Sequence, residues 1–139
     1  MRLFPHMRTS SRNRAIVWGI IAFAALANIA GYLWDLYEQF WWFDDVLHAY
    51  TTFSITLPLA LLLYGDVLRG AHARSILLIL VITSLGMGIG VLWEVAEWAY
   101  DQMVPENAIL GKRDTIIDLI LDALGAVAAG IVTVNIVDS

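Results

Sequence analysis

The sequence contains no cysteine and has few charged residues. The absence of cysteine excludes disulfides, thiolate nucleophiles and thiolate metal ligands. Charged residues make up 15% of the 139 residues and hydrophobic residues 60%, whereas a soluble domain averages about 25% charged. The sequence also shows no phosphate-binding loop, no Ser/His/Asp arrangement and no nucleic-acid-binding footprint. These absences argue against a soluble enzyme and against a nucleic-acid partner.

Long apolar stretches are what the sequence does have. Four of them, each of roughly 20 residues, are long enough to cross a bilayer as helices. We predict an all-α, multi-pass membrane protein with a single four-helix transmembrane domain over residues 15–139. The predicted helices cover residues 15–34, 44–64, 75–100 and 114–137. Residues 1–14 are predicted to form a basic tail, and the aromatic link 35–43 is expected to lie along the membrane surface.

The distribution of basic residues predicts the orientation of the bundle. Six of the eight arginines and lysines lie in the N-terminal tail and the 65–74 loop, and only Lys112 and Arg113 lie in the last loop. Cytoplasmic loops carry an excess of such residues, so we expect both termini in the cytoplasm and the protein in the inner membrane.

Acidic residues gather at the opposite, extracytoplasmic ends of the predicted helices. Of the thirteen acidic residues, only Asp66 and Asp138 fall on the predicted cytoplasmic side. The remainder include same-face sets on three helices, spaced three or four residues apart, together with one histidine. The candidate ligands are Asp44, Asp45, His48, Glu94, Glu97, Asp114, Asp118 and Asp122. Gly86 and Gly90 share a face with Glu94, which predicts close approach of another helix there.

Several carboxylates cannot stay ionised close together without compensation. Shared protons, basic partners and a bound cation can each provide it. Lys112 and Arg113 lie at the mouth of the cluster and do not reach the deeper carboxylates. A divalent cation is therefore the most economical way to compensate the negative charge of those carboxylates. Oxygen ligands with one imidazole favour Mg²⁺, Mn²⁺ or iron over Zn²⁺. The strongest candidates are Glu94, Asp118 and Asp122, since Asp44 and Asp114 fit helix N-terminal roles and Glu97 lies near water.

Three sequence segments resemble a known family. These are Asp45-x-x-His48, Trp93-Glu94-x-x-Glu97-Trp98, and the stretch from Gly111 to Ala126 with Asp114, Asp118 and Asp122. Together they resemble the YjdF-like family of small bacterial inner-membrane proteins, with a weaker similarity to VanZ-like membrane proteins. The resemblance implies a helical membrane fold, in a family whose members often have more than four helices, and it implies no reaction.

Three functions remain open from the sequence. The first is a metal-dependent enzyme acting on a membrane lipid or lipid-linked substrate, with His48 or Glu94 as general base and Lys112 and Arg113 contacting phosphate. The second is a non-catalytic subunit whose site binds a structural ion and whose lipid-facing surfaces dock with other membrane proteins. The third is cation or proton translocation, for which the cytoplasmic half offers few polar groups.

Overall fold

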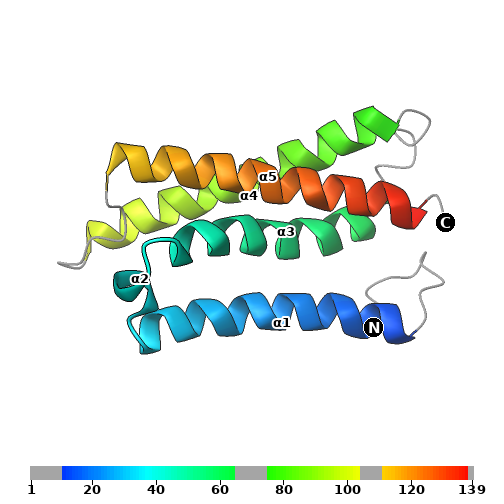
Figure 1. Ribbon diagram of the computed structural model, residues 1–139. Coiled ribbons are helices and arrows are strands. Elements are labelled where there is room, and N and C mark those ends of the chain that lie inside the picture. Colours follow the sequence, from blue (N-terminus) through cyan, green and yellow to red (C-terminus); the bar gives the residue numbers. More distant parts are fainter. Residues whose placement is uncertain (1–10, 65–74, 104–110, 138–139) are drawn as a thin grey trace.

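The computed structural model describes residues 11–64, 75–103 and 111–137. In this part of the chain the protein is entirely helical (Figure 1), with α1 Ser11–Leu33, α2 Leu36–Gln39, α3 Phe43–Leu63, α4 Ser75–Asp101 and α5 Lys112–Val137. All four long helices have the length and apolar composition of membrane spans. The predicted all-α membrane bundle is therefore confirmed, and the chain is a multi-pass membrane protein.

Three of the helices form the packed centre of the bundle. Helix α5 packs against both α3 and α4, whereas α1 packs mainly against α3 and lies to one side (Figure 1). The buried side chains of the centre are small or branched aliphatics: Ala60, Leu78 and Ile82 in one group, and Leu57, Leu61 and Ala129 in another. Large apolar side chains on the outer faces, such as Phe23, Leu80 and Leu124, are exposed as expected for surfaces that contact lipid.

Glycines allow the central helices to approach closely. A Cβ added to Gly125 of α5 would overlap the backbone carbonyl of Ala49 on α3. On α4, a Cβ on Gly86 would overlap the side chain of Ala126 on α5, and one on Gly90 would overlap the carboxylate of Asp122. The close approach predicted for the Gly86 and Gly90 face is confirmed, and its partner is α5.

The link between the first two spans contains a short helix. Asp35 adopts a left-handed conformation with φ 52°, which short polar side chains tolerate, and α2 follows it. Trp34 and Trp41 are 66% and 84% exposed, in keeping with an aromatic segment at a membrane surface. Tyr37 differs from them because it turns inward: its hydroxyl donates a 3.1 Å hydrogen bond to the amide oxygen of Asn28 on α1.

The helix bounds differ from the predicted ones by a few residues. Helix α1 begins at Ser11, inside the region predicted as a basic tail, and α5 begins at Lys112 rather than at residue 114. Pro58 does not interrupt α3, which runs continuously from Phe43 to Leu63 with Pro58 buried. The start of α1 and the end of α5 lie at one end of the bundle, and α2 lies at the other (Figure 1).

Candidate functional site

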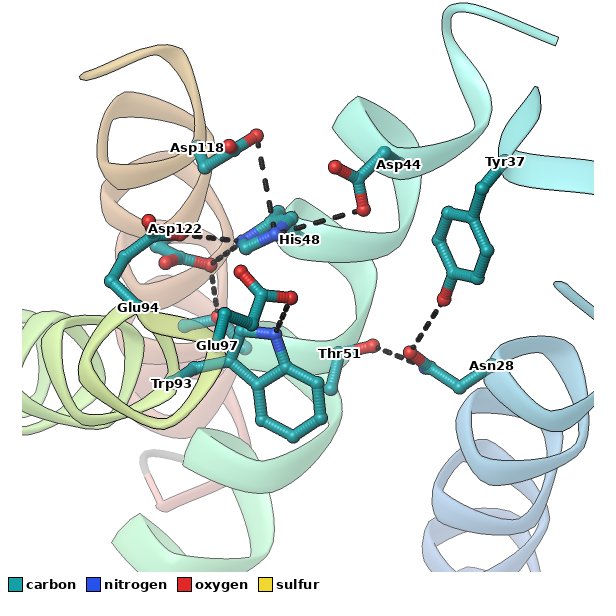
Figure 2. Close-up of polar contacts among 11 residues, drawn as sticks. Asn28, Tyr37, Asp44, His48, Thr51, Trp93, Glu94, Glu97, Asp118 and Asp122 are labelled. Atoms are coloured by element: carbon teal, nitrogen blue, oxygen red, sulfur yellow. Dashed lines mark hydrogen bonds and ion pairs between the residues drawn. The ribbon is translucent and has the colours of Figure 1, made fainter. Parts of the chain in front are cut away.

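The site is built around His48, a buried imidazole near the start of α3. Its Nε2 atom lies 3.8 Å from Asp44 Oδ1 and 4.0 Å from Asp118 Oδ1. Its Nδ1 atom lies 3.4 Å from Asp122 Oδ1 and 4.0 Å from Glu94 Oε1. Figure 2 shows these carboxylates reaching the ring from three helices. We call His48 with Asp44, Glu94, Asp118 and Asp122 the His48 cluster.

Helical spacing explains why these residues meet. Asp44 and His48 are one turn apart on α3, and Asp118 and Asp122 are one turn apart on α5. Glu94 lies one turn after Gly90 on α4, and the missing Cβ of Gly90 leaves room for the Asp122 carboxylate. The cluster therefore depends on side-chain spacing within each helix and on close packing between α4 and α5.

A hydrogen bond holds Asp122 in place. The Thr52 hydroxyl on α3 donates to Asp122 Oδ1 at 2.5 Å, and both groups are buried. Because this same oxygen is the acceptor closest to His48 Nδ1, the geometry favours the tautomer whose proton points at Asp122. The free Nε2 lone pair then faces Asp44 and Asp118. A carboxylate that orients a histidine in this way is typical of metal sites.

Several carboxylate oxygens of the cluster are buried without a hydrogen bond. Among the residues that the structure describes, this holds for both oxygens of Glu94, for Asp118 Oδ1 and for Asp122 Oδ2. Glu94 is 7% exposed and Asp118 is 2% exposed. Thr115 on α5 lies near Glu94 but does not form a hydrogen bond of normal length with it. Buried polar atoms without partners are costly, so the cluster is suited to a ligand that supplies positive charge or donors.

Two overlapping triads in the site bring possible metal-ligand atoms together. One comprises Asp44, His48 and Asp118, and the other comprises His48, Glu94 and Glu97; in each, the ligand atoms lie within 4.8 Å of one another. Glu97 is half-buried, and its Oε1 accepts a 2.8 Å hydrogen bond from the Trp93 indole (Figure 2). Both triads share His48, so its imidazole is the common element of any cation site here.

Besides Glu97, four predicted site residues lie outside the His48 cluster. Asp45 and Asp114 are half-buried, and Asp114 is close enough to Asp44 to interact with it electrostatically. Lys112 and Arg113 are exposed in the first turn of α5. Neither of these basic residues lines the hollow described next, so their predicted phosphate contact stays a prediction.

A small, partly open hollow lies beside the cluster. Its polar wall contains Asp44, His48, Thr52, Glu97 and Asp122, together with a hydrogen-bonded chain from α1, α2 and α3. In that chain Tyr37 donates to Asn28, whose Nδ2 donates to Thr51 Oγ1 at 3.1 Å (Figure 2). Burial raises the pKa of the Tyr37 hydroxyl, which stays protonated as the donor.

Sequence reasoning missed two parts of this wall. It assigned no part of the site to Asn28, Thr52 or Tyr37. For Thr52 a signal was present, because Asp44, His48 and Thr52 are successive members of one four-residue stripe. Tyr37 gave no such signal, since its inward direction depends on the left-handed turn at Asp35.

Comparison with known proteins gives a family but no reaction. A family model described as "Predicted membrane protein (DUF2238)" matches residues 3–139. A protein of Thermotoga maritima, described as an uncharacterized protein, is 35% identical over 106 residues, which are 72% of this chain and 52% of that protein. The chain thus spans about half the length of this relative. No solved structure matches the chain.

Proposed function

Because this chain belongs to the DUF2238 family of predicted membrane proteins, we propose its function from its own polar site: the His48 cluster binds one divalent cation. The YjdF-like name stays a prediction, since the matching family carries another name. The observation that carries the proposal is the set of buried, unpartnered carboxylate oxygens on α4 and α5 around one imidazole on α3. No lysine or arginine is among the residues that line the adjoining hollow, as far as the structure describes the chain.

The geometry favours one triad for the cation. His48 Nε2, Asp44 and Asp118 provide one nitrogen and two carboxylates, while Asp122 and Thr52 orient the ring from the other side. Ligand atoms around one ion held at about 2.1 Å lie roughly 3.0–3.4 Å apart, so the observed 3.8 and 4.0 Å require a small inward movement. This ligand chemistry suits Mg²⁺, Mn²⁺ or Fe²⁺ better than Zn²⁺.

A cation in this position can support catalysis. It polarises an oxygen of a bound substrate, or lowers the pKa of a bound water. With His48 acting as a ligand and Asp122 orienting its ring, Glu94 is the remaining buried carboxylate of the cluster and the preferred general base. It does not itself line the hollow, so it would act on a group held at the cation. We therefore propose a metal-dependent reaction on a ligand that reaches the site through the hollow.

One observation favours a second candidate function. Both nitrogens of His48 face carboxylates, and this arrangement also suits a protonated imidazole that acts as counter-ion between α4 and α5. The cluster would then tie three helices together without a cation, as in a structural subunit of a larger membrane complex. The two functions are distinguished by whether the purified protein retains a bound cation.

The test is a metal titration of purified protein with matched variants. Wild-type protein, loaded in turn with Mg²⁺, Mn²⁺ and Fe²⁺ and then desalted, is expected to retain one ion per chain. Asp118→Asn and Asp44→Asn keep the side-chain volume but remove a ligand charge, so each should lower retention to background. Asp45→Asn is the control, since Asp45 lies next to Asp44 and outside the cluster.

Folding is checked in the same samples by circular dichroism and size-exclusion chromatography. A folded wild-type protein that retains none of the three ions contradicts the proposal and favours the counter-ion role. Loss of the ion in Asp45→Asn but not in Asp118→Asn would contradict the assigned ligands.

A further inference from the structure

We propose that the hollow beside the His48 cluster binds a long-chain alcohol that enters sideways from the bilayer, with its hydroxyl group at the cluster. This inference rests on the proposed function, because the hydroxyl oxygen is placed next to the bound cation. It adds the chemical class of the ligand and its route of entry.

The hollow has a polar end and an apolar end. Its polar lining lies around His48 and Glu97, with Leu47 beside His48, and its deeper apolar lining is formed by Ile55 and Ile89. Ile55 follows His48 by seven residues on α3, so it lies roughly 10 Å further along the helix, toward the middle of the membrane. A ligand that fills the hollow therefore has a polar head near the end of the bundle and a chain that points into the bilayer.

The hollow lies between α1 and α4, both of which contribute lining residues. Helix α1 packs on α3 and α4 packs on α5, while α1 and α4 share no substantial interface. Figure 2 shows Asn28 of α1 and Trp93 of α4 on opposite sides, with α3 behind them. Ile55 and Trp93, which line the hollow, are 40% and 42% exposed, so its edge is accessible to a molecule in the membrane.

The hydrogen-bond inventory of the wall selects a ligand that donates. Four side-chain donors of the wall already have acceptors inside the protein: Tyr37 donates to Asn28, Asn28 to Thr51, Thr52 to Asp122, and Trp93 to Glu97. By contrast, Asp122 Oδ2 is buried without a partner, and Asp44 and Glu97 offer further carboxylate oxygens. A head group with a proton to donate satisfies these oxygens.

The charge of the wall excludes anionic head groups. Asp44, Glu97 and Asp122 line the hollow, and no described lysine or arginine does. A phosphodiester or a carboxylate would bring a further negative charge and no proton donor. A primary alcohol donates its proton to a carboxylate and offers its oxygen to the cation, whereas an ammonium group would compete with that cation.

The experiment uses the full chain in nanodiscs with Mn²⁺ or Mg²⁺. The probe is hexadecanol with a photoreactive diazirine in its chain. The comparison probes carry the same chain with a methyl ether, a phosphate or an amine as head group. We expect the alcohol to label peptides that contain Ile55 and Ile89. Its half-saturating concentration should be about five- to tenfold lower than that of the ether, the effect expected of one net hydrogen bond.

Two tryptophan substitutions on α4 provide the matched variants. Ile89→Trp fills the hollow and is expected to reduce labelling by the alcohol while leaving one cation per chain. Val91→Trp places the same side chain at a position that is 47% exposed and does not line the hollow, so its labelling should equal that of wild type.

Each remaining outcome has a defined meaning. Equal labelling by the ether and the alcohol, or unchanged labelling in an Ile89→Trp variant that binds the cation normally, overturns the inference. Stronger labelling by the amine in the presence of cation overturns the choice of an alcohol. Specific alcohol labelling in a protein that retains no cation supports the hollow as the alcohol site and shows that only the proposed cation function has failed.

Discussion

Thr52 on α3 and Asp122 on α5, separated by 70 residues in the sequence, are joined by a buried hydrogen bond of 2.5 Å. Asp122 Oδ1 is also the carboxylate oxygen nearest to His48 Nδ1. One oxygen atom therefore connects helix packing to the orientation of the imidazole.

The first prediction concerns Thr52→Val, which keeps the shape of the side chain and removes its hydroxyl. Because Asp122 loses a buried donor, we expect the free energy of unfolding to fall by about 1.5–3 kcal/mol. The affinity for the divalent cation should weaken roughly 10- to 100-fold, since His48 is no longer held in one orientation. Isothermal titration calorimetry measures the affinity. Ser84→Ala is the control: it removes an exposed hydroxyl that donates a hydrogen bond within α4, and it should leave the cation affinity unchanged.

The second prediction compares two glycines on α4. Gly90→Ala places a methyl group in the position of the Asp122 carboxylate, so we expect a loss of stability of about 1–3 kcal/mol and weaker cation binding. Gly88→Ala adds the same methyl group where no atom lies within 4 Å. Its stability should be unchanged or slightly higher. Thermal unfolding of both variants measures the difference, and equal melting temperatures would contradict the packing described here.

The third prediction concerns the contact between α3 and α5. A methyl group on Gly125 meets the carbonyl oxygen of Ala49, which is backbone and cannot rotate away. We expect Gly125→Ala to separate the two helices and to reduce the yield of folded protein more than Gly90→Ala does. Gly19→Ala on α1 has open space around it and serves as the control. Normal expression and monodispersity of Gly125→Ala would contradict this contact.

The fourth prediction concerns pH and Tyr37. Burial raises the pKa of this hydroxyl in the folded protein, so the folded state keeps a proton that the unfolded state releases above about pH 10. Stability from this group is present below that pH and is lost as the pH rises further. Tyr37→Phe should therefore show a smaller drop in melting temperature between pH 8 and pH 11 than wild type. An equal drop in both proteins would count against a raised pKa of the half-buried Tyr37.

The fold followed from the sequence because its signal is strong and local. Four apolar stretches of membrane length leave few alternatives, and same-face spacing brings Asp44 and His48, or Asp118 and Asp122, to one side of a helix. Close approach at Gly86 and Gly90 was likewise visible in the spacing. The structure brings the carboxylates of Asp44, Asp118 and Asp122 within 4.0 Å of His48, while their role in binding a cation stays a prediction.

Other features could not be predicted from local patterns. Asn28 of α1 lines the hollow because α1 packs beside α3. Tyr37 reaches Asn28 from α2, which follows the left-handed residue Asp35, and spacing along the chain indicates neither feature. The hollow arises because α1 and α4 stay apart, which depends on how all four spans pack together. Spacing within one helix carries no information on such gaps.

The start of α1 and the end of α5 lie at the end of the bundle opposite the His48 cluster, and this determines which compartment supplies the cation. If the termini lie in the cytoplasm, as the basic residues predict, the cluster draws its cation from the other compartment. Its occupancy then follows external ion concentrations and external chelators rather than the cytoplasmic pool. A reporter fused after the end of α5 would leave the mouth of the cluster unobstructed, and intact cells would give an impermeant chelator access to the site.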